Sequence, residues 1–381
     1  MGSVPSTGSF PWSIPGTGSP STLLQLVTEE DSLPFERTEP NPFLSAEPNP
    51  RNSAELHRTY PTPAQPPRHR TSPTPGVRKH PRLRPAEEAD SRLPEQIGAF
   101  RIGRALARGG MSEVVEAWDV VRHRTVALKV MRPTGPGRRA EREAWDREIA
   151  ILEALRHPGV VPLVDYGIGE GGELFLAMPL LEGRSARGEL VAMRRCGPAA
   201  LSATTYDVLL PAFLDVCRTL QYVHERGVLH CDLKPGNIFL PRGPSGSRGL
   251  LLDWGVSVVR ESAKPDPHGE GGRPGGTPGY MSPEQIRGRV ADLDVRSDVY
   301  GLGCLLYEFI CWRPAIRRGD PSRALKDALR GNVVNPEGRN PQLRVPRVLA
   351  EIVMKALSVK RSDRYASAGE MGDAVDRALY G

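Results

Sequence analysis

Two short stretches in the second half of the chain carry side chains suited to handling phosphate. The first, HCDLKPGN, spans residues 230–237, and the second, DWG, begins sixteen residues later at Asp253. Phosphoryl transfer asks a protein mainly for a carboxylate that can accept a proton, oxygen ligands for magnesium and a cation on the moving phosphate. Asp232, Asn237, Asp253 and Lys234 could supply these groups. The two stretches therefore indicate a nucleotide-dependent phosphotransfer site.

A lysine in the first half of the chain could join this site. Lys129 ends the apolar stretch that begins at Val126, which is typical of a buried strand. A lysine in that position is costly to bury without a partner carboxylate. Residues 140–155 have apolar side chains at helical spacing, and this predicted helix offers two candidates, Glu148 and Glu143. Spacing alone leaves both open.

A glycine-bearing turn precedes this lysine. Alternating apolar and polar residues begin at Phe100 and resume at Val114, with Gly109 and Gly110 between them. The alternation predicts two strands, and glycine in the turn would let backbone amides approach phosphate closely. A Gly-Gly turn is also typical of an ordinary hairpin, so it adds little by itself.

Taken together, these motifs resemble those of the eukaryotic-like (Hanks-type) Ser/Thr protein kinases, which are also found in bacteria. The resemblance runs from about Phe100 to about Arg377. It implies an α+β, bilobal protein-kinase-like fold with an ATP cleft between the lobes. The N-lobe, an antiparallel sheet plus one helix, is expected at residues 98–181, and the mainly helical C-lobe at 182–381. Residues 1–97, rich in proline and serine and without an apolar period, are predicted to be a disordered tail.

The resemblance also implies roles for individual residues. Asp232 would be the catalytic base, Lys234 would neutralise the γ-phosphate, and Asn237 and Asp253 would bind Mg²⁺. Glu148, nine residues before His157-Pro158, would pair with Lys129 and position it against the α- and β-phosphates. The other residues expected to bind ATP are Leu106, Gly109 and Gly110 near the glycine turn, Val114 and Ala127 above the adenine, Phe239 below it, Met178 as gatekeeper and Leu181 in the hinge.

Several structural contacts are expected on the same basis. Thr277 would hydrogen-bond Asp232 and Lys234, and Asp298 would cap the backbone of the catalytic loop. A buried ion pair is expected between Glu284 and Arg364, and Trp254 is expected to pack between Leu152 and His230.

Four residues depart from the family pattern: Ala107 and Ser112 in the outer glycine places, Trp254 for phenylalanine, and Cys231 for the arginine that commonly precedes the catalytic aspartate. That arginine pairs with a phosphorylated activation loop in the family. Residues 256–276 contain only Ser257 and Ser262 as acceptors. We therefore expect that loop phosphorylation is not the main switch, unless another basic residue replaces the arginine.

The predicted function is that of a protein Ser/Thr kinase that transfers the γ-phosphate of Mg-ATP to protein hydroxyls. The alternative is a catalytically weak pseudokinase acting as a nucleotide-binding scaffold, which the four departures suggest and the retained phosphate-handling residues oppose. A small-molecule phosphotransferase on a related fold is a third reading. Residues 276–284 and Lys234 argue against it, because in the family they build a platform for a peptide substrate.

Composition limits the partners. The 381 residues carry a net charge of +6 with both signs mixed, so no nucleic-acid partner is expected. Five cysteines without a Cys-x-x-Cys pair suggest a reducing compartment, and hence a cytoplasmic location. The longest apolar run noted, Val299–Trp312, contains Glu308 and is too short to span a bilayer, so no integral membrane segment is expected. The sequence does not indicate the oligomeric state, the physiological substrate, the activating signal or the role of the tail.

Overall fold

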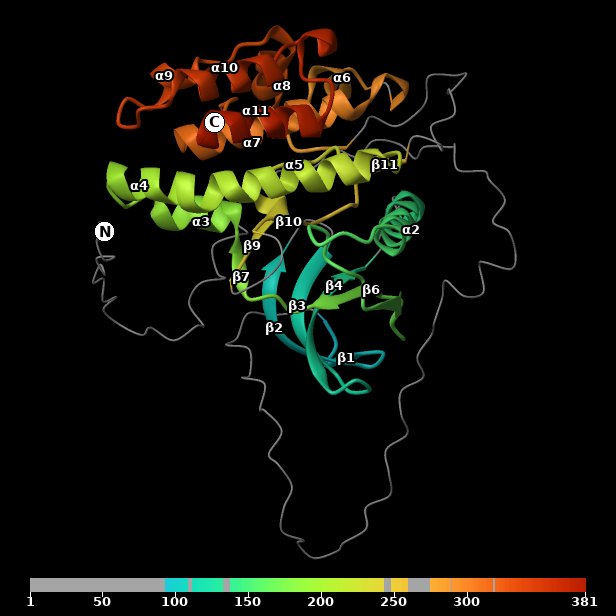
Figure 1. Cartoon of the computed structure of the whole chain (residues 1–381). Helices are drawn as coiled ribbons and strands as arrows, with labels where there is room; N and C mark the ends of the chain where they lie inside the picture. The colour runs from blue at the N-terminus through green and yellow to red at the C-terminus, as the bar shows by residue number, and fades with distance from the viewer. Residues whose placement is uncertain are drawn as a thin grey trace, which may run out of the picture.

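The chain folds into a sheet-containing part and a helical part. This computed structural model describes residues 93–108, 112–132, 138–242, 248–259, 275–288, 290–317 and 319–381. The predicted tail lies outside them, except for its last five residues. Figure 1 shows the sheet on one side of α5 and most of the helices on the other. This arrangement confirms the predicted α+β class, with an antiparallel N-lobe and a mainly helical C-lobe.

The N-lobe is a six-stranded antiparallel sheet in the order β1-β2-β3-β4-β6-β5. Its strands are β1 (Gln96–Ile97), β2 (Phe100–Arg108), β3 (Ser112–Asp119), β4 (Arg124–Met131), β5 (Asp165–Ile168) and β6 (Leu174–Pro179). The strand β1 corrects the predicted end of the tail at residue 97, because Ile97 pairs with Phe100 and is buried in the N-lobe core. Burial of Ile97 and Ala99 beside Phe100 accounts for this early start of the fold.

The two faces of the sheet follow the alternation of the strands. Val126, Leu128 and Val130 of β4 are buried in one apolar cluster with Phe100 and Phe175, whose rings meet edge to face at 5.4 Å. Side chains of neighbouring positions point to the opposite face of a strand, which places Ala127 and Lys129 together on the other face. That second face is the one on which the site is built.

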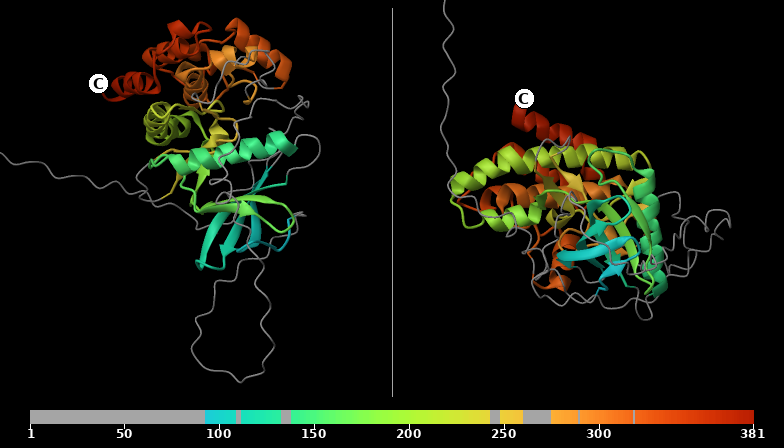
Figure 2. Two further views of the ribbon diagram at one scale, coloured as in Figure 1. Left: turned by 90° about the vertical axis from the view of Figure 1, so that its right-hand side faces the viewer. Right: turned by 90° about the horizontal axis from the view of Figure 1, so that it is seen from below.

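Helix α2 (Arg138–Ala154) packs beside this second face (Figure 2). Trp145, Ile149 and Leu152 recur at helical spacing and are buried in one cluster with Leu176 of β6. The helix stops ahead of His157-Pro158, as predicted, since proline cannot continue it.

The C-lobe is organised around α7 (Val295–Cys311), which is buried from Ser297 to its end. Helices α5, α10 and α11 contact α7. The C-lobe helices besides α7 are α3 (Ala186–Met193), α4 (Pro198–Thr204), α5 (Leu210–His224), α6 (Pro283–Arg287), α8 (Pro321–Arg330), α9 (Pro336–Arg339), α10 (Arg347–Ala356) and α11 (Ala368–Tyr380). Its short strands are β7 (Gly183–Ser185), β8 (Val228–Leu229), β9 (Ile238–Pro241), β10 (Leu250–Leu251) and β11 (Val258–Val259). They form two small sheets, β10-β9-β7 and β11-β8.

One helical stretch in the described residues is long and apolar enough to cross a membrane by length and composition. It runs over Pro198–His224, from α4 through a short π-helical turn into α5, and is longer than the run noted in the sequence. Most apolar side chains of α5, including Phe213 and Leu220, are buried in the C-lobe core. Core packing therefore accounts for its hydropathy.

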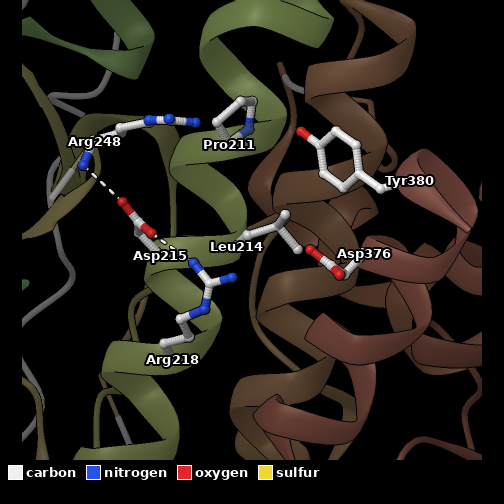
Figure 3. Close-up of a pocket in the computed structure, with 7 residues that line it drawn as sticks. All are labelled: Pro211, Leu214, Asp215, Arg218, Arg248, Asp376 and Tyr380. Atoms are coloured by element: carbon white, nitrogen blue, oxygen red, sulfur yellow. Dashed lines mark hydrogen bonds and ion pairs between the residues drawn. The ribbon is translucent and has the colours of Figure 1, made fainter.

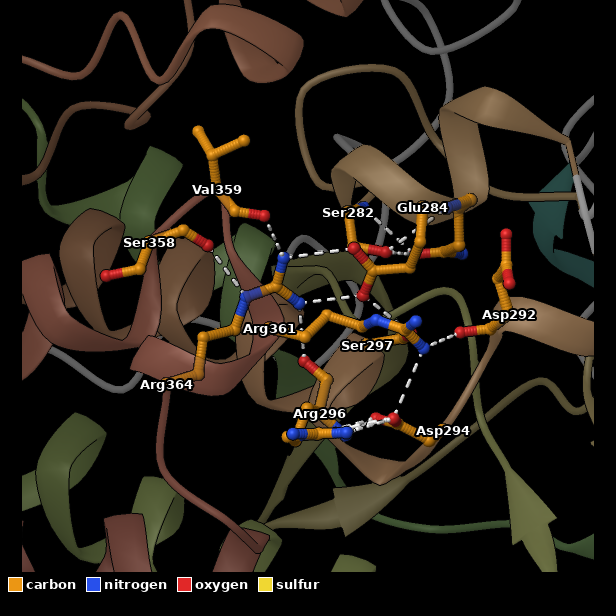
Figure 4. Close-up of polar contacts among 11 residues, drawn as sticks. Ser282, Glu284, Asp292, Asp294, Arg296, Ser297, Ser358, Val359, Arg361 and Arg364 are labelled. Atoms are coloured by element: carbon orange, nitrogen blue, oxygen red, sulfur yellow. Dashed lines mark hydrogen bonds and ion pairs between the residues drawn. The ribbon is translucent and has the colours of Figure 1, made fainter.

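The predicted Glu284–Arg364 ion pair is present and buried (Figure 4). Arg364 donates from Nη1 to Glu284 Oε1 at 2.7 Å and from Nη2 to Oε2 at 3.0 Å. Its remaining donors reach the carbonyl oxygens of Ser358, Arg296 and Val359, while Ser297 donates to Glu284. The pair thus joins α6, α7 and the segment before α11. Burial alone would raise the pKa of Glu284, but Arg364 and Ser297 hold it below its ordinary value.

We expect Arg364→Ala to lower the free energy of unfolding by about 3–5 kcal/mol, because it leaves the Glu284 carboxylate buried without its partner. Urea denaturation followed by circular dichroism would measure the loss. The matched control is Arg347→Ala, which removes an exposed arginine paired with Glu351 and should leave stability nearly unchanged. Equal free energies of unfolding for the two variants would show that the buried pair does not contribute to stability as expected.

Candidate phosphotransfer site

Lys129 is held by two carboxylates from different parts of the chain. Its Nζ donates to both oxygens of Glu148 in α2, at 2.7 and 2.9 Å, and to Oδ1 of Asp253 at 2.9 Å. Of the two partners left open by spacing, the structure therefore selects Glu148 over Glu143. The Lys129–Asp253 contact joins the N-lobe sheet to the C-lobe.

Lys129 and Asp253 stabilise each other in their ionised forms. Burial alone would lower the pKa of Lys129, but the adjacent Asp253 and Glu148 outweigh it and raise that pKa above its ordinary value. Lys129 in turn lowers the pKa of Asp253 well below its ordinary value, while burial raises that of Glu148. Lys129 therefore stays cationic and Asp253 anionic at neutral pH, as binding of phosphate and metal requires.

The Asp232 carboxylate is fixed by three neighbours. Its Oδ1 accepts from the backbone N of Thr277 at 2.9 Å and from Thr277 Oγ1 at 2.7 Å. Lys234 Nζ lies 3.0 Å from Asp232 Oδ2 and donates to Thr277 Oγ1 at 2.8 Å. Asn237 donates from Nδ2 to Asp232 Oδ2 at 3.1 Å and to the Asp232 carbonyl at 2.9 Å. The predicted contacts of Thr277 with Asp232 and Lys234 are confirmed.

The backbone before Asp232 is anchored by a buried carboxylate. Asp298, in the first turn of α7, accepts from the backbone N–H groups of His230 and Cys231, each at 2.8 Å, and lies 2.8 Å from His224 Nε2. Burial alone would raise the pKa of Asp298, but these hydrogen bonds lower it on balance. Cys231 has φ 64°, a left-handed conformation uncommon outside glycine. The predicted cap by Asp298 is confirmed, and it helps to hold this conformation.

Gln285 is a second anchor, and the sequence reasoning missed it. Its Nε2 donates to the Cys231 carbonyl at 2.7 Å and to the Gly275 carbonyl at 3.4 Å, and its Oε1 accepts from the backbone N of Ser282 at 2.9 Å. Ser282 and Gln285 form a capping box at the start of α6. The Ser-x-x-Gln spacing was visible in the sequence and predicts that box, but not the reach to Cys231.

The residues expected around the adenine come from both lobes. Ala127 pairs with Met178 across β4 and β6, and Val114 pairs with Lys129 across β3 and β4. Val114, Lys129, Ala127 and Met178 therefore lie on the three neighbouring strands that carry the site. Leu106 lies on β2, and its side chain is buried. Gly109 and Gly110 lie outside the described residues.

On the C-lobe side of the residues expected around the adenine, the backbone at Gly183 lies close to Phe239 and Leu240. Leu181 leads from β6 into β7, where Gly183 has φ 149°. A Cβ at Gly183 would collide with the Leu240 carbonyl and lie 2.8 Å from the Phe239 ring. Only glycine therefore fits where the chain passes between the lobes beside Phe239.

Trp254 is almost fully buried, as expected of an apolar plug. Its ring centroid lies 4.8 Å from that of His230, and it shares one hydrophobic cluster with Leu152. The substitution of tryptophan for phenylalanine therefore preserves the packing role.

The residues present fit a magnesium ion held jointly with a ligand. Among the described residues no group of three or more His, Cys, Asp or Glu side chains could hold a metal. Asn237 commits its NH₂ group to Asp232, which leaves its side-chain carbonyl oxygen as a candidate metal ligand. The ionised Asp253 carboxylate offers a second oxygen ligand. Mg²⁺ is commonly bound by one or two protein oxygens, with waters and substrate phosphates completing its coordination.

The surroundings of Cys231 are apolar. Cys231, Leu229 and Leu293 are buried in one cluster, with Val258 and Val295 packed against it. Burial raises the pKa of the Cys231 thiol well above its ordinary value, so the thiol stays neutral. Ser257 is buried and donates to the His230 carbonyl at 3.3 Å. Ser262 lies outside the described residues.

Comparisons with known proteins agree with this geometry. Residues 100–372 match the protein kinase domain family, and the chain belongs to that family, which confirms the resemblance stated from its motifs. It is 33% identical over 299 residues to serine/threonine-protein kinase PknD of Chlamydia felis, covering 74% of this chain and 31% of that protein. It is 32% identical over 305 residues to PknD of Chlamydia trachomatis serovar D, covering 74% and 32%. Identity to serine/threonine-protein kinase PknH of Mycobacterium bovis is also 32%, over 294 residues, covering 77% and 46%. The chain thus spans less than half the length of these relatives.

We expect Gln285→Glu to loosen the catalytic loop, because a carboxylate cannot donate to the Cys231 and Gly275 carbonyls and would face them with negative charge. Hydrogen–deuterium exchange should speed up in peptides covering residues 229–233 and 275–281. The matched control is Gln342→Glu, the same change at an exposed position. Unchanged exchange in the first variant would show that Gln285 does not hold the loop.

Proposed function

We propose that the chain is a protein Ser/Thr kinase that transfers the γ-phosphate of ATP to serine or threonine hydroxyls of proteins. The observation that carries the proposal is the Asp232 carboxylate, fixed between Thr277, Lys234 and Asn237. The names of the bacterial relatives support the Ser/Thr class.

Asp232 is proposed as the base. A substrate hydroxyl that donates to this carboxylate would be oriented toward the γ-phosphate, and its proton would pass to Asp232 as the new P–O bond forms. Lys234, 3.0 Å from Asp232 Oδ2, is placed to neutralise charge on the transferred group. Thr277 forms hydrogen bonds with both side chains and so holds the base, Asp232, and the cation, Lys234, in a fixed relative position.

The nucleotide is proposed to lie between Lys129 and the adenine-side residues Leu106, Val114, Ala127, Met178, Leu181 and Phe239. Lys129, already oriented by Glu148, would contact the α- and β-phosphates. Asn237 and Asp253 would hold Mg²⁺, which when bound offsets phosphate charge. Lys129 contacts Glu148 and Asp253, and Asp232 contacts Lys234 and Asn237. The presence of both sets of contacts supports an active kinase over a scaffold that only binds nucleotide.

Activation is proposed to proceed without phosphorylation of the loop. Where the family commonly has an arginine, the buried Cys231 lies in an apolar cluster and its carbonyl is tied to Gln285. Gln285 also reaches Gly275, so hydrogen bonds join the end of the activation segment to the catalytic loop. A phosphate on the activation loop would therefore find no cation at position 231. The contacts of Gln285 join Cys231 to Gly275 without a phosphate.

We expect Asp232→Asn to lower the initial rate of autophosphorylation with labelled ATP by about 10²–10⁴-fold, because the base is removed. Calorimetric ATP affinity should be retained, since Lys129 and Asp253 are untouched. Asp207→Asn, the same change at an exposed acid, serves as the control. A variant as active as the wild type would rule out Asp232 as the base.

We expect phosphatase-treated and untreated protein to phosphorylate an added protein substrate at the same initial rate. Ser257→Ala and Ser262→Ala should each retain activity, because neither hydroxyl is needed as an acceptor. Loop phosphorylation would be the switch if two results were found together. The rate of the wild type would fall on phosphatase treatment, and the untreated Ser257→Ala or Ser262→Ala variant would already have that low rate.

A further inference from the structure

Two hollows in the C-lobe lie away from the Asp232 site. The first, of about 640 Å³, lies between α5 and the end of α11 (Figure 3). Its charges are balanced, with Asp215 and Asp376 facing Arg218 and Arg248, and Asp215 is bonded to Arg218 and to the backbone N of Arg248. The second, of about 430 Å³, lies between α6, the start of α7 and the segment before α11.

The second hollow, here called the α6 basic hollow, is lined by four cationic side chains. These are Arg287, Arg296, Lys360 and Arg361. The carboxylate of Glu284 in its wall is already neutralised by the buried Arg364. Asp292 and Asp294 are the other acids at this site. Four cations against two carboxylates leave a surplus of two positive charges.

Two of the cations are held in place. Asp294 binds Arg296 through two nitrogens, at 3.2 and 2.7 Å, and also accepts from Arg361 at 3.3 Å (Figure 4). Arg361 donates further to the Asp292 carbonyl. One carboxylate is therefore shared by two guanidinium groups that already have their orientation fixed. Such preorganised guanidinium groups are well suited to an anion with several oxygens.

The other two cations have no such partners. Arg287, at the end of α6, and Lys360 are both exposed, and in the part of the chain that the structure describes neither has a carboxylate partner. Their positive charges are open to an incoming anion. A phosphorylated side chain carries about −1.5 to −2 charges at neutral pH, which matches the surplus of the hollow, whereas a single carboxylate would neutralise half of it.

The position of the hollow indicates where such an anion comes from. Residues 277–282 run from the Asp232 contact of Thr277 directly into α6, and Arg287 is the last residue of that helix. A protein bound with its acceptor hydroxyl at Asp232 can therefore extend along this segment to the hollow. We propose that the α6 basic hollow binds a phosphorylated side chain of a protein substrate, so that previously phosphorylated proteins are preferred. The statement that the bound protein is a substrate rests on the proposed kinase function.

The test compares binding of the full chain to immobilised phosphorylated β-casein and to the same casein treated with phosphatase. We expect tighter binding to the phosphorylated form, and a loss of about fivefold or more of that affinity in Arg287→Ala/Lys360→Ala. The control, Arg101→Ala/Arg344→Ala, removes the same charge from exposed arginines elsewhere and should bind like the wild type.

Three outcomes would overturn the proposal. Equal binding to both caseins would show that phosphate is not recognised, and equal weakening by both double variants would reduce the effect to net charge. Inorganic phosphate, added at the same concentration as the phosphate groups on the casein, could also displace the chain from the phosphorylated casein. That result would show that a free phosphate ion is enough and that the protein part of the substrate is not recognised. The measurement uses no ATP and can be repeated with Asp232→Asn, so a chain without kinase activity would fail the rate assays and still give a clear result here.

Discussion

The whole site depends on one cation shared by two carboxylates. Lys129 extends from the sheet, Glu148 from α2 and Asp253 from the end of the β10 segment, and the three meet within 2.9 Å. Because Lys129 and Asp253 belong to different lobes, their contact links the two lobes at the site, and Glu148 links α2 to the same cation. Removing any of the three would leave a partly buried charge without its partner. The position of α2 and the closure of the lobes are thus coupled by electrostatics.

Much of this arrangement could be predicted from the sequence, because the motifs are local. HCDLKPGN and DWG each place their side chains within one turn or loop. The choice of Glu148 over Glu143 needed the family resemblance as well, because it rests on the distance from the glutamate to His157-Pro158 that is typical of the family. The strand β1 was missed because two residues give no alternation to detect. Gln285 was missed because its target, Cys231, lies far away along the chain. Pairings of this kind depend on tertiary contacts that no local pattern contains.

The apolar cluster at Cys231 shows how one substitution changes the physics of an anchor. An arginine at this position would require an anion opposite it, whereas Cys231, Leu229 and Leu293 need only exclude water. The amide of Gln285 then supplies direction, because it bonds the Cys231 and Gly275 carbonyls. A neutral anchor of this kind is insensitive to salt and to phosphatases, unlike a charged one.

The burial of Trp254 has a consequence for ligands that act by rearranging the loop. The indole fills a site between His230 and the α2 side of the core, and emptying that site would cost about 3–5 kcal/mol, the range found when large aromatic side chains are removed from a core. An inhibitor that works by expelling this ring must recover that energy from its own contacts. Compounds that leave the indole in place and compete only for the adenine side avoid the cost altogether.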